Sequence, residues 1–379
     1  MEGRKREERL DVMKGLLIVL VVAGHFLLPL KDLGGGFVNG IFYWIYSFHM
    51  PAFVFLSGLF SSSVIKDGHY RFGRPLSLLW LYLCYKLIVF FPERLAYGPS
   101  GSLPDLLHES GAPWYLLALF FWYLLILPLS LYRTRGEKCF AMVFLLLFSL
   151  LFGYMDDAEG IKDLLSLDRV TAFLPFFFLA YFLGVQGLKE LCPERGSLKE
   201  GLCILIGLSL SLFSALQARS LLSPYLQLFY GGWYRKLGFS GMPEPIRAFP
   251  WLLRLLWYPF SLSIAFSIFL LIPILRRREL LWGVLRKIGE RTLQIYILHR
   301  PIRDLLLAAG YPKLMSVCPK LLTIFMLFFS LLLSVLLSHP SLTGFFSRLQ
   351  GFPELLLGLL SPRRAEKQRT EARKYRTKV

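Results

Sequence analysis

The chain has 379 residues, of which 55% are hydrophobic, and it carries a formal net charge of +18. Long apolar runs recur as far as residue 360, which is typical of a polytopic membrane protein rather than a soluble domain. The basic residues lie between these runs and in the C-terminal segment RRAEKQRTEARKYRTK, a placement that argues against nucleic acid and favours anionic lipid headgroups as a partner.

Ten apolar segments approach the length of roughly 20 residues that a helix needs to cross a bilayer. We expect helices near residues 12–30, 41–64, 75–92, 114–132, 139–154, 171–187, 201–218, 250–275, 292–309 and 320–338. This pattern predicts an all-α, polytopic membrane bundle with about ten transmembrane helices.

The charges between these segments alternate in sign. Basic connections carry Lys66, Arg71 and Arg74, then Arg133, Arg135 and Lys138, then Arg276, Arg277, Arg278, Arg286 and Lys287. The other connections carry Glu93 and Asp105, or Asp156, Asp157, Glu159, Asp163 and Asp168. By the positive-inside rule, the alternation predicts an even number of helices with both termini in the cytoplasm, and we expect the membrane to be a bacterial cytoplasmic membrane.

The first apolar segment, RLDVMKGLLIVLVVAGHF, carries a stripe of ionisable side chains. His25 follows Lys14 by eleven positions, which at about 100° per residue places both on one helix face, and Asp11 lies about 40° from that line. Ionisable groups inside a membrane usually face a bundle interior or a water-filled pocket where they act. The stripe favours a membrane enzyme or a transporter, although residues 1–30 also resemble a signal peptide.

The second apolar segment contains FHMPAFVFLSGLF. Pro51 frees a backbone carbonyl one turn earlier and bends the helix, which opens room beside His49 for water or substrate. Alternatively, His49 forms only a hydrogen bond to a neighbouring helix. Ser57 and Gly58 are expected to serve close helix packing.

Later segments carry weaker signals. Trp114 and Tyr115 begin a predicted helix at the outer surface, where an aromatic belt explains them. Residues 219–249 are interrupted by glycine and proline and predict an extracytoplasmic loop. In IYILHRP, His299 lies close in sequence to Arg300 and Arg303. We expect His299 to hold the substrate or the donor, or only to pack and orient its neighbours.

Three parts of the chain are predicted. Residues 1–340 form the membrane domain, residues 341–362 form an interfacial or additional helix, and residues 363–379 form a basic cytoplasmic tail. Arg348, Pro353 and Glu354 favour an interfacial position for the helix.

Five segments, taken in order, resemble the membrane-bound acyltransferase 3 family. They are RLDVMKG with a histidine eleven residues after its lysine, FHMPAFVFLSG, RFGRPLSLLW, WYLLALFFW and IGERTLQIYILHRP. The resemblance runs from about residue 9 to 338 and is closest to the branch that resembles fucose 4-O-acetylases. It implies transfer of an acyl group, commonly acetyl, from cytoplasmic acyl-CoA to carbohydrate hydroxyls on or across the membrane.

Two departures from the family pattern matter. Much of the family has arginine where this chain has Lys14, which still supplies a cation but lacks the guanidinium fork. We expect no counterpart of the hydrolase-like domain that some members append, so any second transfer step would need a partner.

The implied reaction assigns roles to the residues. A sugar hydroxyl needs a general base, and imidazole has a suitable pKa, so we expect His25 to be the catalytic base. Lys14 lies about 16 Å from His25 along the helix and is expected to bind the donor nearer the cytoplasm, paired with Asp11. Arg71 and Arg74 are expected to join Lys14 in holding CoA phosphates, unless they are only the positive-inside signal.

The chain is therefore predicted to be a membrane O-acyltransferase with acetyl-CoA or another acyl-CoA as co-substrate and no tightly bound cofactor or metal. The cysteines are scattered and lack CxxC spacing. The expected acceptor is a glycan or glycolipid, and glycan-assembly proteins are possible further partners. A competing interpretation is a transporter or flippase for a lipid-linked sugar or polysaccharide, against which the sequence shows neither paired inverted halves nor an intramembrane carboxylate for ion coupling. A membrane scaffold would leave the Lys14 and His25 stripe unexplained.

Overall fold

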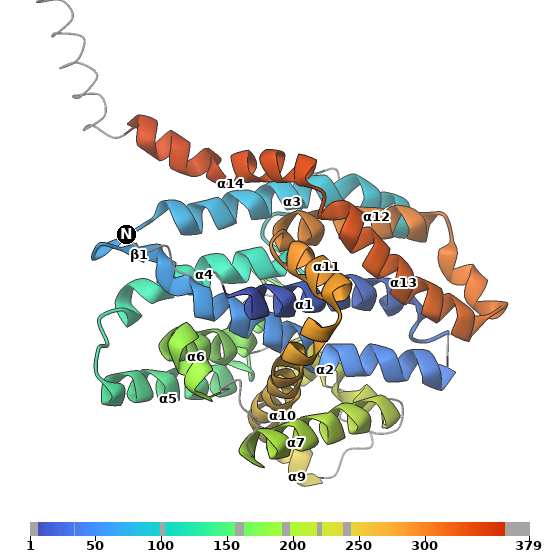
Figure 1. Ribbon diagram of the computed structural model, residues 1–379, viewed down its shortest axis with the longest axis horizontal. Coiled ribbons are helices and arrows are strands. Elements are labelled where there is room, and N and C mark those ends of the chain that lie inside the picture. The colour runs from blue at the N-terminus through green and yellow to red at the C-terminus, as the bar shows by residue number, and fades with distance from the viewer. Residues whose placement is uncertain are drawn as a thin grey trace, which may run out of the picture.

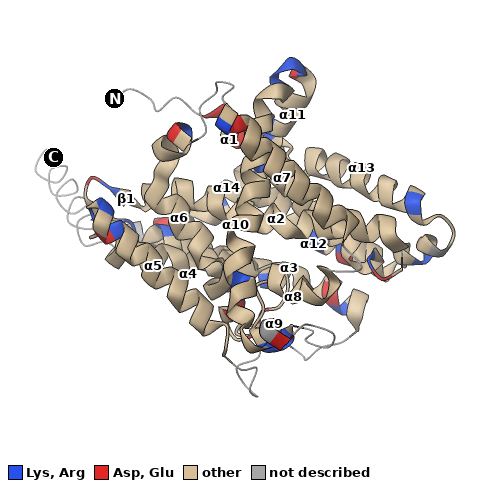
Figure 2. Ribbon diagram, turned by 90° about the horizontal axis from the view of Figure 1, so that it is seen from below, with Lys and Arg blue, Asp and Glu red and all other residues tan. Residues whose placement is uncertain are grey.

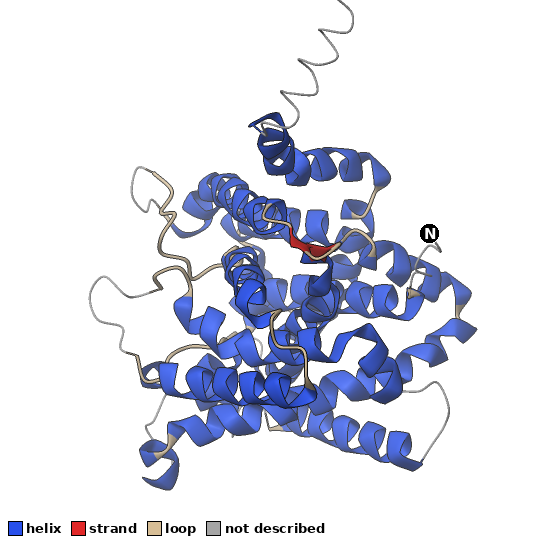
Figure 3. Cartoon of the chain, turned by 90° about the vertical axis from the view of Figure 1, so that its left-hand side faces the viewer, coloured by secondary structure: helices blue, strands red, loops and turns tan. Residues whose placement is uncertain are grey.

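A computed structural model describes residues 7–33, 35–98, 103–155, 163–191, 198–217, 222–237 and 244–360. The basic tail 363–379 and the acidic residues Asp156, Asp157 and Glu159 lie outside the described residues. The described chain is almost entirely helical (Figure 3). It includes one two-stranded hairpin, in which Ile65 pairs with Tyr70 and Lys66 with His69.

All ten predicted helices are present. They are α1 (Glu8–Leu27), α2 (Gly35–Ser61), α3 (Gly73–Tyr97), α4 (Trp114–Leu129), α5 (Arg135–Phe152), α6 (Leu167–Leu191), α7 (Leu198–Leu216), α10 (Pro250–Leu271), α12 (Thr292–Ala308) and α13 (Pro319–Leu337). Within the described ranges, seven helical segments, built on α1, α2, α3, α6, α7, α10 and α13, are long and apolar enough to cross a membrane. The protein is an all-α, integral membrane helix bundle.

Shorter elements connect these helices. They are η1 (Leu28–Leu30), η2 (Ser62–Val64), β1 (Ile65–Lys66), β2 (His69–Tyr70), η4 (Ser223–Tyr225), α8 (Leu226–Phe229), η5 (Tyr234–Lys236), α9 (Glu244–Ala248), η6 (Ile272–Arg277), α11 (Glu279–Gly289), η7 (Tyr311–Ser316) and α14 (Pro340–Leu360). Helix α11 occupies a stretch that was predicted to be a basic connection. It is too short to span a bilayer, and its apolar residues Leu285 and Ile288 are buried. Helix α14 covers the segment that was expected to be an interfacial or additional helix.

Helix α1 lies in the middle of the bundle (Figure 1). It packs against α2, α11, α12 and α13, while α2 also packs against α6, α7 and α10. Because lipid tails are as apolar as leucine, close packing and internal hydrogen bonds, rather than removal of apolar surface from water, hold such helices together. The two histidine-bearing helices, α1 and α2, are therefore fixed by neighbours on several sides.

Glycines allow the closest helix crossings. A Cβ atom at Gly15 of α1 would overlap the carbonyl oxygen of Leu285, and one at Gly289 of α11 would overlap that of Asp11. Similarly, a Cβ at Gly58 of α2 would overlap the Phe177 carbonyl of α6, which confirms the predicted packing role of this glycine. Backbone-to-backbone contact at these crossings sets the position of α1, and with it the position of its ionisable side chains.

Charged residues lie mainly at helix ends and in connections, and the middle of the bundle is mostly uncharged (Figure 2). At the N-terminal end of α1, Glu8 pairs with Arg286 of α11 at 2.6 Å, and Glu7 pairs with Lys189 of α6 at 2.5 Å. These contacts gather the N-terminus of α1, the C-terminal part of α6 and α11 at one end of the molecule.

Adding one methyl group at Gly289 is expected to force α11 away from α1, whereas the same change at Gly283 is not. Both glycines lie in α11, but no atom lies within 4 Å of the position where a Gly283 Cβ would be. Overpacking typically costs about 1–3 kcal/mol, so Gly289→Ala should lower the thermal unfolding temperature of the purified protein in detergent. Gly283→Ala should leave it unchanged or raise it slightly. Equal unfolding temperatures for the two variants would contradict the described crossing.

Candidate active site

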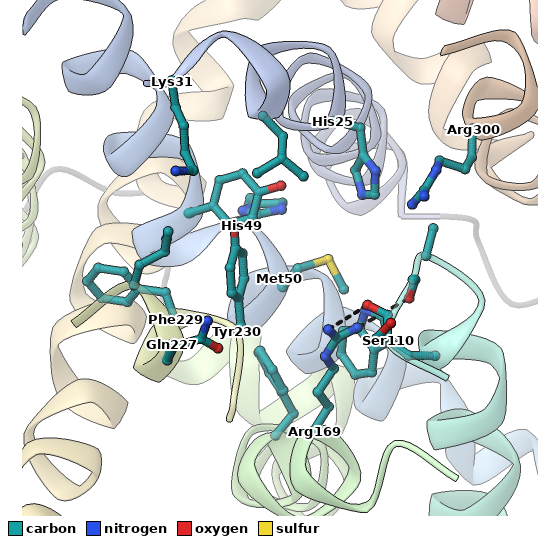
Figure 4. Close-up of a pocket in the computed structure, with 17 residues that line it drawn as sticks. His25, Lys31, His49, Met50, Ser110, Arg169, Gln227, Phe229, Tyr230 and Arg300 are labelled. Atoms are coloured by element: carbon teal, nitrogen blue, oxygen red, sulfur yellow. Dashed lines mark hydrogen bonds between the residues drawn. The ribbon is translucent and has the colours of Figure 1, made fainter. Parts of the chain in front are cut away.

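A cavity of about 430 Å³ lies beside the C-terminal part of α1 (Figure 4). Its wall is formed by α1, α2, α6, α12, the segment before α4 and the segment that includes α8. Polar side chains from these elements reach it, including His25, His49, Arg169, Tyr230 and Arg300. We refer to it as the His25 cavity. Because its residues come from distant parts of the chain, the cavity exists only in the assembled bundle.

Packing of α12 against α1 brings two of the predicted histidines together. The rings of His25 and His299 meet edge to face, with centroids 5.0 Å apart. His299 is fully buried, and its Nδ1 lies 3.0 Å from the Ile295 carbonyl oxygen, so a neutral ring donates from Nδ1 and keeps a lone pair on Nε2. Neither Nδ1 of His25 nor Nε2 of His299 has a hydrogen-bond partner among the described residues. Each ring therefore keeps one buried nitrogen without a hydrogen-bond partner, and His25 lines the cavity.

The third predicted histidine, His49, lines the same cavity at the proline position of α2. Its Nδ1 donates to the Ile45 carbonyl oxygen at 2.7 Å. Pro51 lacks the N–H that would bond to the Ser47 carbonyl, and Ser261 of α10 donates to that carbonyl instead, at 2.6 Å. The predicted polar pocket beside His49 is thus confirmed, and a neighbouring helix satisfies the freed carbonyl.

A guanidinium group is fixed beside His25. Arg300 Nε donates to both carboxylate oxygens of Asp304, at 2.9 and 3.2 Å, and its Nη2 lies 3.3 Å from Glu93 Oε1. The fully buried Arg303 forms an ion pair with the same Asp304. A buried carboxylate thus lies in a predicted membrane span, contrary to the sequence-based expectation, but it pairs with two arginines. Burying two guanidinium groups without carboxylate partners would be strongly unfavourable. Asp304 therefore supplies the charge that keeps Arg300 oriented along the cavity wall, where Figure 4 shows it beside His25.

The segment before α4 closes another wall, and the sequence analysis did not identify it. Arg169 of α6 donates to the carbonyl oxygens of Ser110 and Gly111, at 2.7 and 3.2 Å. From the other side, Lys86 of α3 pairs with the buried Glu109 at 2.8 Å. Two charged side chains from different helices thus hold this segment against the cavity.

The prediction that Trp114 and Tyr115 form an aromatic belt is wrong, because only 8% of Trp114 and 5% of Tyr115 is exposed. Trp114 lines the His25 cavity, and the Arg169 guanidinium lies 5.7 Å from its ring centroid. Tyr115 lines a second cavity. Aromatic residues at the start of an apolar helix give the same sequence signal in both environments.

The segment 222–237, which was expected to be part of a loop, folds into short helical turns. It places Tyr230 on the cavity, with its ring 5.2 Å from the ring of Tyr46 on α2. Burial raises the pKa of Tyr230 well above its ordinary value, so its hydroxyl stays protonated. The fully buried Arg254 anchors the segment by donating to the Gly232 carbonyl at 2.6 Å. No periodic pattern marks this wall in the sequence, where glycines and prolines interrupt residues 219–249.

A second cavity, of about 200 Å³, contains Lys14, and we refer to it as the Lys14 cavity. Lys14 Nζ pairs with Asp11 Oδ1 at 2.7 Å, as predicted, and lies 4.7 Å from the centroid of the Phe60 ring. Lys14 is the one charged residue among the described residues that line this cavity, which otherwise has mainly leucine, phenylalanine and tyrosine side chains. The arrangement offers a single cation at the edge of an apolar space.

Two tyrosines lie between the cavities. Tyr115 and Tyr296 both line the Lys14 cavity, and their ring centroids are 5.6 Å apart. The Tyr296 ring is 6.2 Å from that of His299, and its hydroxyl donates to the carbonyl of Ala112, which lines the His25 cavity. The Tyr115 hydroxyl contacts Ser57. The two cavities therefore approach each other from different ends of α1 and are separated by an aromatic partition.

The structure does not place Arg71 and Arg74 on either cavity. Arg71 Nη2 and Arg74 Nε lie 3.5 and 3.9 Å from the carboxylate oxygens of Glu354 in α14. Of the predicted site residues, the structure brings the three histidines together and pairs Lys14 with Asp11. Among the described residues, no group of three histidine, cysteine, aspartate or glutamate side chains is arranged to hold a metal ion.

Comparison with known proteins gives a family match over most of the chain. The profile of the family Acyl_transf_3, described as an acyltransferase domain, matches residues 7–339. The chain is 31% identical over 138 residues to the nodulation protein NolL of Mesorhizobium japonicum, which covers 34% of this chain and 37% of the relative. It is 33% identical over 130 residues to NolL of Sinorhizobium fredii, which covers 31% of this chain and 35% of the relative. These alignments thus span little more than a third of each relative's length, and no solved structure matches the chain.

Removing the guanidinium of Arg169 is expected to loosen the segment that closes the His25 cavity. Hydrogen bonds to a charged group contribute about 1.5–3 kcal/mol, so in Arg169→Met the backbone amides of residues 109–112 should exchange with deuterium at least about tenfold faster. Arg247→Met, which removes an exposed guanidinium from α9, is the control and should leave this exchange unchanged. Unaltered exchange in Arg169→Met would contradict the anchoring role.

Proposed function

The chain belongs to the Acyl_transf_3 acyltransferase family, and we propose that it moves an acyl group, acetyl in the simplest case, from acyl-CoA to a hydroxyl of a glycan or glycolipid. The observation that carries this proposal is that one cavity is lined both by the His25 imidazole, which keeps a nitrogen without a hydrogen-bond partner, and by the fixed guanidinium of Arg300. Acyl transfer to a hydroxyl needs a base and a stabilising charge in a site that excludes bulk water.

The His25 cavity suits a sugar as acceptor. Its volume of about 430 Å³ is in the range of pockets that hold small organic ligands. Aromatic rings of Tyr46, Trp114, Phe173 and Tyr230 line it and offer flat apolar surfaces, while the polar groups between them offer hydrogen bonds to hydroxyls. A glycan or the sugar of a glycolipid presents both kinds of surface.

The Lys14 cavity suits the donor. Its lining combines apolar side chains, which suit the methylene groups of an acyl-pantetheine arm, with Ser57, Thr292 and Gln350, which can bond to the amides of that arm, and Lys14 supplies the cation expected for donor binding. From there a thioester would need to pass Tyr296 and Tyr115 to reach His25. We therefore assign the donor to the Lys14 cavity and the acceptor to the His25 cavity.

In the proposed reaction, His25 takes the proton from the acceptor hydroxyl as its oxygen attacks the thioester carbonyl carbon. The new C–O ester bond forms and the C–S bond breaks. The CoA thiolate leaves and takes up the proton from His25. Arg300, oriented by Asp304, faces the negative charge that develops on the carbonyl oxygen, and it needs no reorganisation at that moment.

The distribution of charge supports one orientation in the membrane. The N-terminus of α1, Lys189 and Arg286 gather at one end of the bundle, and we assign this end to the cytoplasm of a bacterial cytoplasmic membrane. Both termini then lie in the cytoplasm, where acyl-CoA is available and where the basic residues meet anionic lipid headgroups. The Lys14 cavity is closer to this end than the His25 cavity, because Lys14 precedes His25 along α1.

Replacing His25 by alanine is expected to reduce acyl transfer by about 10²- to 10⁴-fold, the contribution of a positioned general base. The assay incubates purified protein in lipid vesicles with labelled acetyl-CoA and a membrane glycolipid extract, and it follows label in the glycolipid fraction. His69→Ala, which alters a histidine in the exposed hairpin, should transfer label like the wild type. Undiminished transfer by a folded His25→Ala protein would exclude His25 as the base.

Lys14 is expected to act through its positive charge rather than its shape. Lys14→Arg should retain most activity, whereas Lys14→Ala should raise KM for acetyl-CoA by about tenfold, because one charge-assisted contact is lost. Initial rates at varied acetyl-CoA concentration separate KM from kcat. If Lys14→Ala left KM unchanged, the donor assignment of the Lys14 cavity would be wrong.

A further inference from the structure

Helix α14 directly follows the part of the chain that the family profile matches. The family profile matches residues 7–339, and α14 begins at Pro340. The helix lies along α3 (Figure 1) and also contacts α12. It therefore covers a part of the acyltransferase domain near the Lys14 cavity.

The first turns of α14 are attached firmly. Thr343 donates to the Gln294 side chain of α12 at 3.1 Å, and the Gln294 amide donates to the carbonyls of Leu337 and His339. One turn later, Phe346 is buried, with 4% of its surface exposed. The N-terminal half of α14 is therefore part of the packed bundle.

The next turns bring two polar side chains towards the donor region. Gln350 lines the Lys14 cavity together with Leu78 of α3. Glu354 follows four residues later, on the next turn of the same face, and pairs with Arg71 and Arg74. Arg74 likewise lies one turn before Leu78 on α3. Glu354 and Arg74 thus each lie about one helical turn, or about 5.4 Å along the helix axis, from a residue that lines the Lys14 cavity.

The Glu354 ion pairs are suited to exchange. The side chains of Arg71, Arg74 and Glu354 are 37%, 43% and 38% exposed, and their charged atoms are 3.5 and 3.9 Å apart. Exposed pairs with such geometry are weak. A diphosphate carries more charge than a carboxylate and can accept hydrogen bonds from both guanidinium groups at once.

We propose that Glu354 is a built-in competitor of the acyl donor: its carboxylate occupies the Arg71 and Arg74 pair, and the diphosphate of acyl-CoA must displace it when the acyl-pantetheine arm enters the Lys14 cavity. The C-terminal half of α14 then acts as a lid that lowers donor affinity in the resting enzyme. This inference rests on the proposed assignment of the donor to the Lys14 cavity, and it adds a regulatory contact to that assignment.

The test compares Glu354→Gln with the wild type in steady-state transfer from acetyl-CoA. The variant should lower KM for acetyl-CoA on the order of three- to tenfold with little change in kcat, since it removes competition without touching the reacting groups. Glu8→Gln is the matched control, because it also removes one carboxylate from an exposed ion pair with an arginine, and it should leave KM unchanged. An unchanged KM in Glu354→Gln, or an equal decrease in Glu8→Gln, would overturn the proposal.

Two further measurements determine whether Arg71 and Arg74 bind the diphosphate of CoA or the phosphate of lipid headgroups. With acetyl-pantetheine, which lacks the diphosphate, Glu354→Gln and the wild type should have the same KM. The decrease with acetyl-CoA should also persist in vesicles of phosphatidylcholine alone. A decrease that required phosphatidylglycerol, or that appeared equally with acetyl-pantetheine, would assign the arginine pair to lipid headgroups and overturn the donor role.

Direct binding of labelled acetyl-CoA to the purified proteins tests the competition by Glu354 separately from the donor assignment of the Lys14 cavity. Tighter binding to Glu354→Gln supports the competition. Equal binding to the variant and the wild type rejects the competition but leaves the donor assignment intact. Absence of binding to both, with no transfer, rejects the proposed function and the lid with it.

Discussion

A charged or polar group inside a membrane bundle must find its partner within the protein, and this constraint organises the centre of the structure. Asp304 supplies the counter-charge for Arg300 and Arg303, and Asp11 does the same for Lys14. The backbone carbonyl that Pro51 frees receives the hydroxyl of Ser261 from another helix. The imidazoles of His25 and His299 keep nitrogens without a hydrogen-bond partner among the described residues, and so does the guanidinium of Arg303, which Asp304 neutralises as an ion pair.

The close crossing of α1 and α11 fixes the helix that carries both Lys14 and His25, and these two residues line different cavities. Because glycine backbones meet at Gly15 and Gly289, α1 is held in the middle of the bundle, with Lys14 in one cavity and His25 in the other. Tyr115 and Tyr296 fill the space between the cavities. A donor and an acceptor that bind at different ends of α1 would meet at His25, which is the geometry that the proposed transfer needs.

Hydrophobicity and charge predicted the helices well, because a membrane-spanning helix needs a long apolar run and little else. The stripe on the first helix predicted the Asp11–Lys14 pair correctly, because helical spacing fixes contacts within one helix. The meeting of His25 with His299 depends on how α12 packs against α1, and no spacing in the sequence encodes that contact.

The errors have equally specific causes. Arg169 and the segment around Tyr230 were missed because cavity walls built from connections have no period to detect. Trp114 and Tyr115 were misassigned because a buried aromatic residue and an interfacial one look alike in sequence. Helix α11 was predicted to be a connection because the segment is short and contains several basic residues. Its apolar face becomes evident only from its packing against α1.

The most direct test of the two-cavity account is an experimental structure, by electron cryomicroscopy, of the protein with a non-hydrolysable acetyl-CoA analogue in lipid. The account predicts density for the acyl-pantetheine arm in the Lys14 cavity, directed past Tyr296 towards His25, with the His25 cavity left open for the acceptor. Density for the analogue inside the His25 cavity, between Arg169 and Tyr230, would contradict the separation of donor and acceptor on which the account depends.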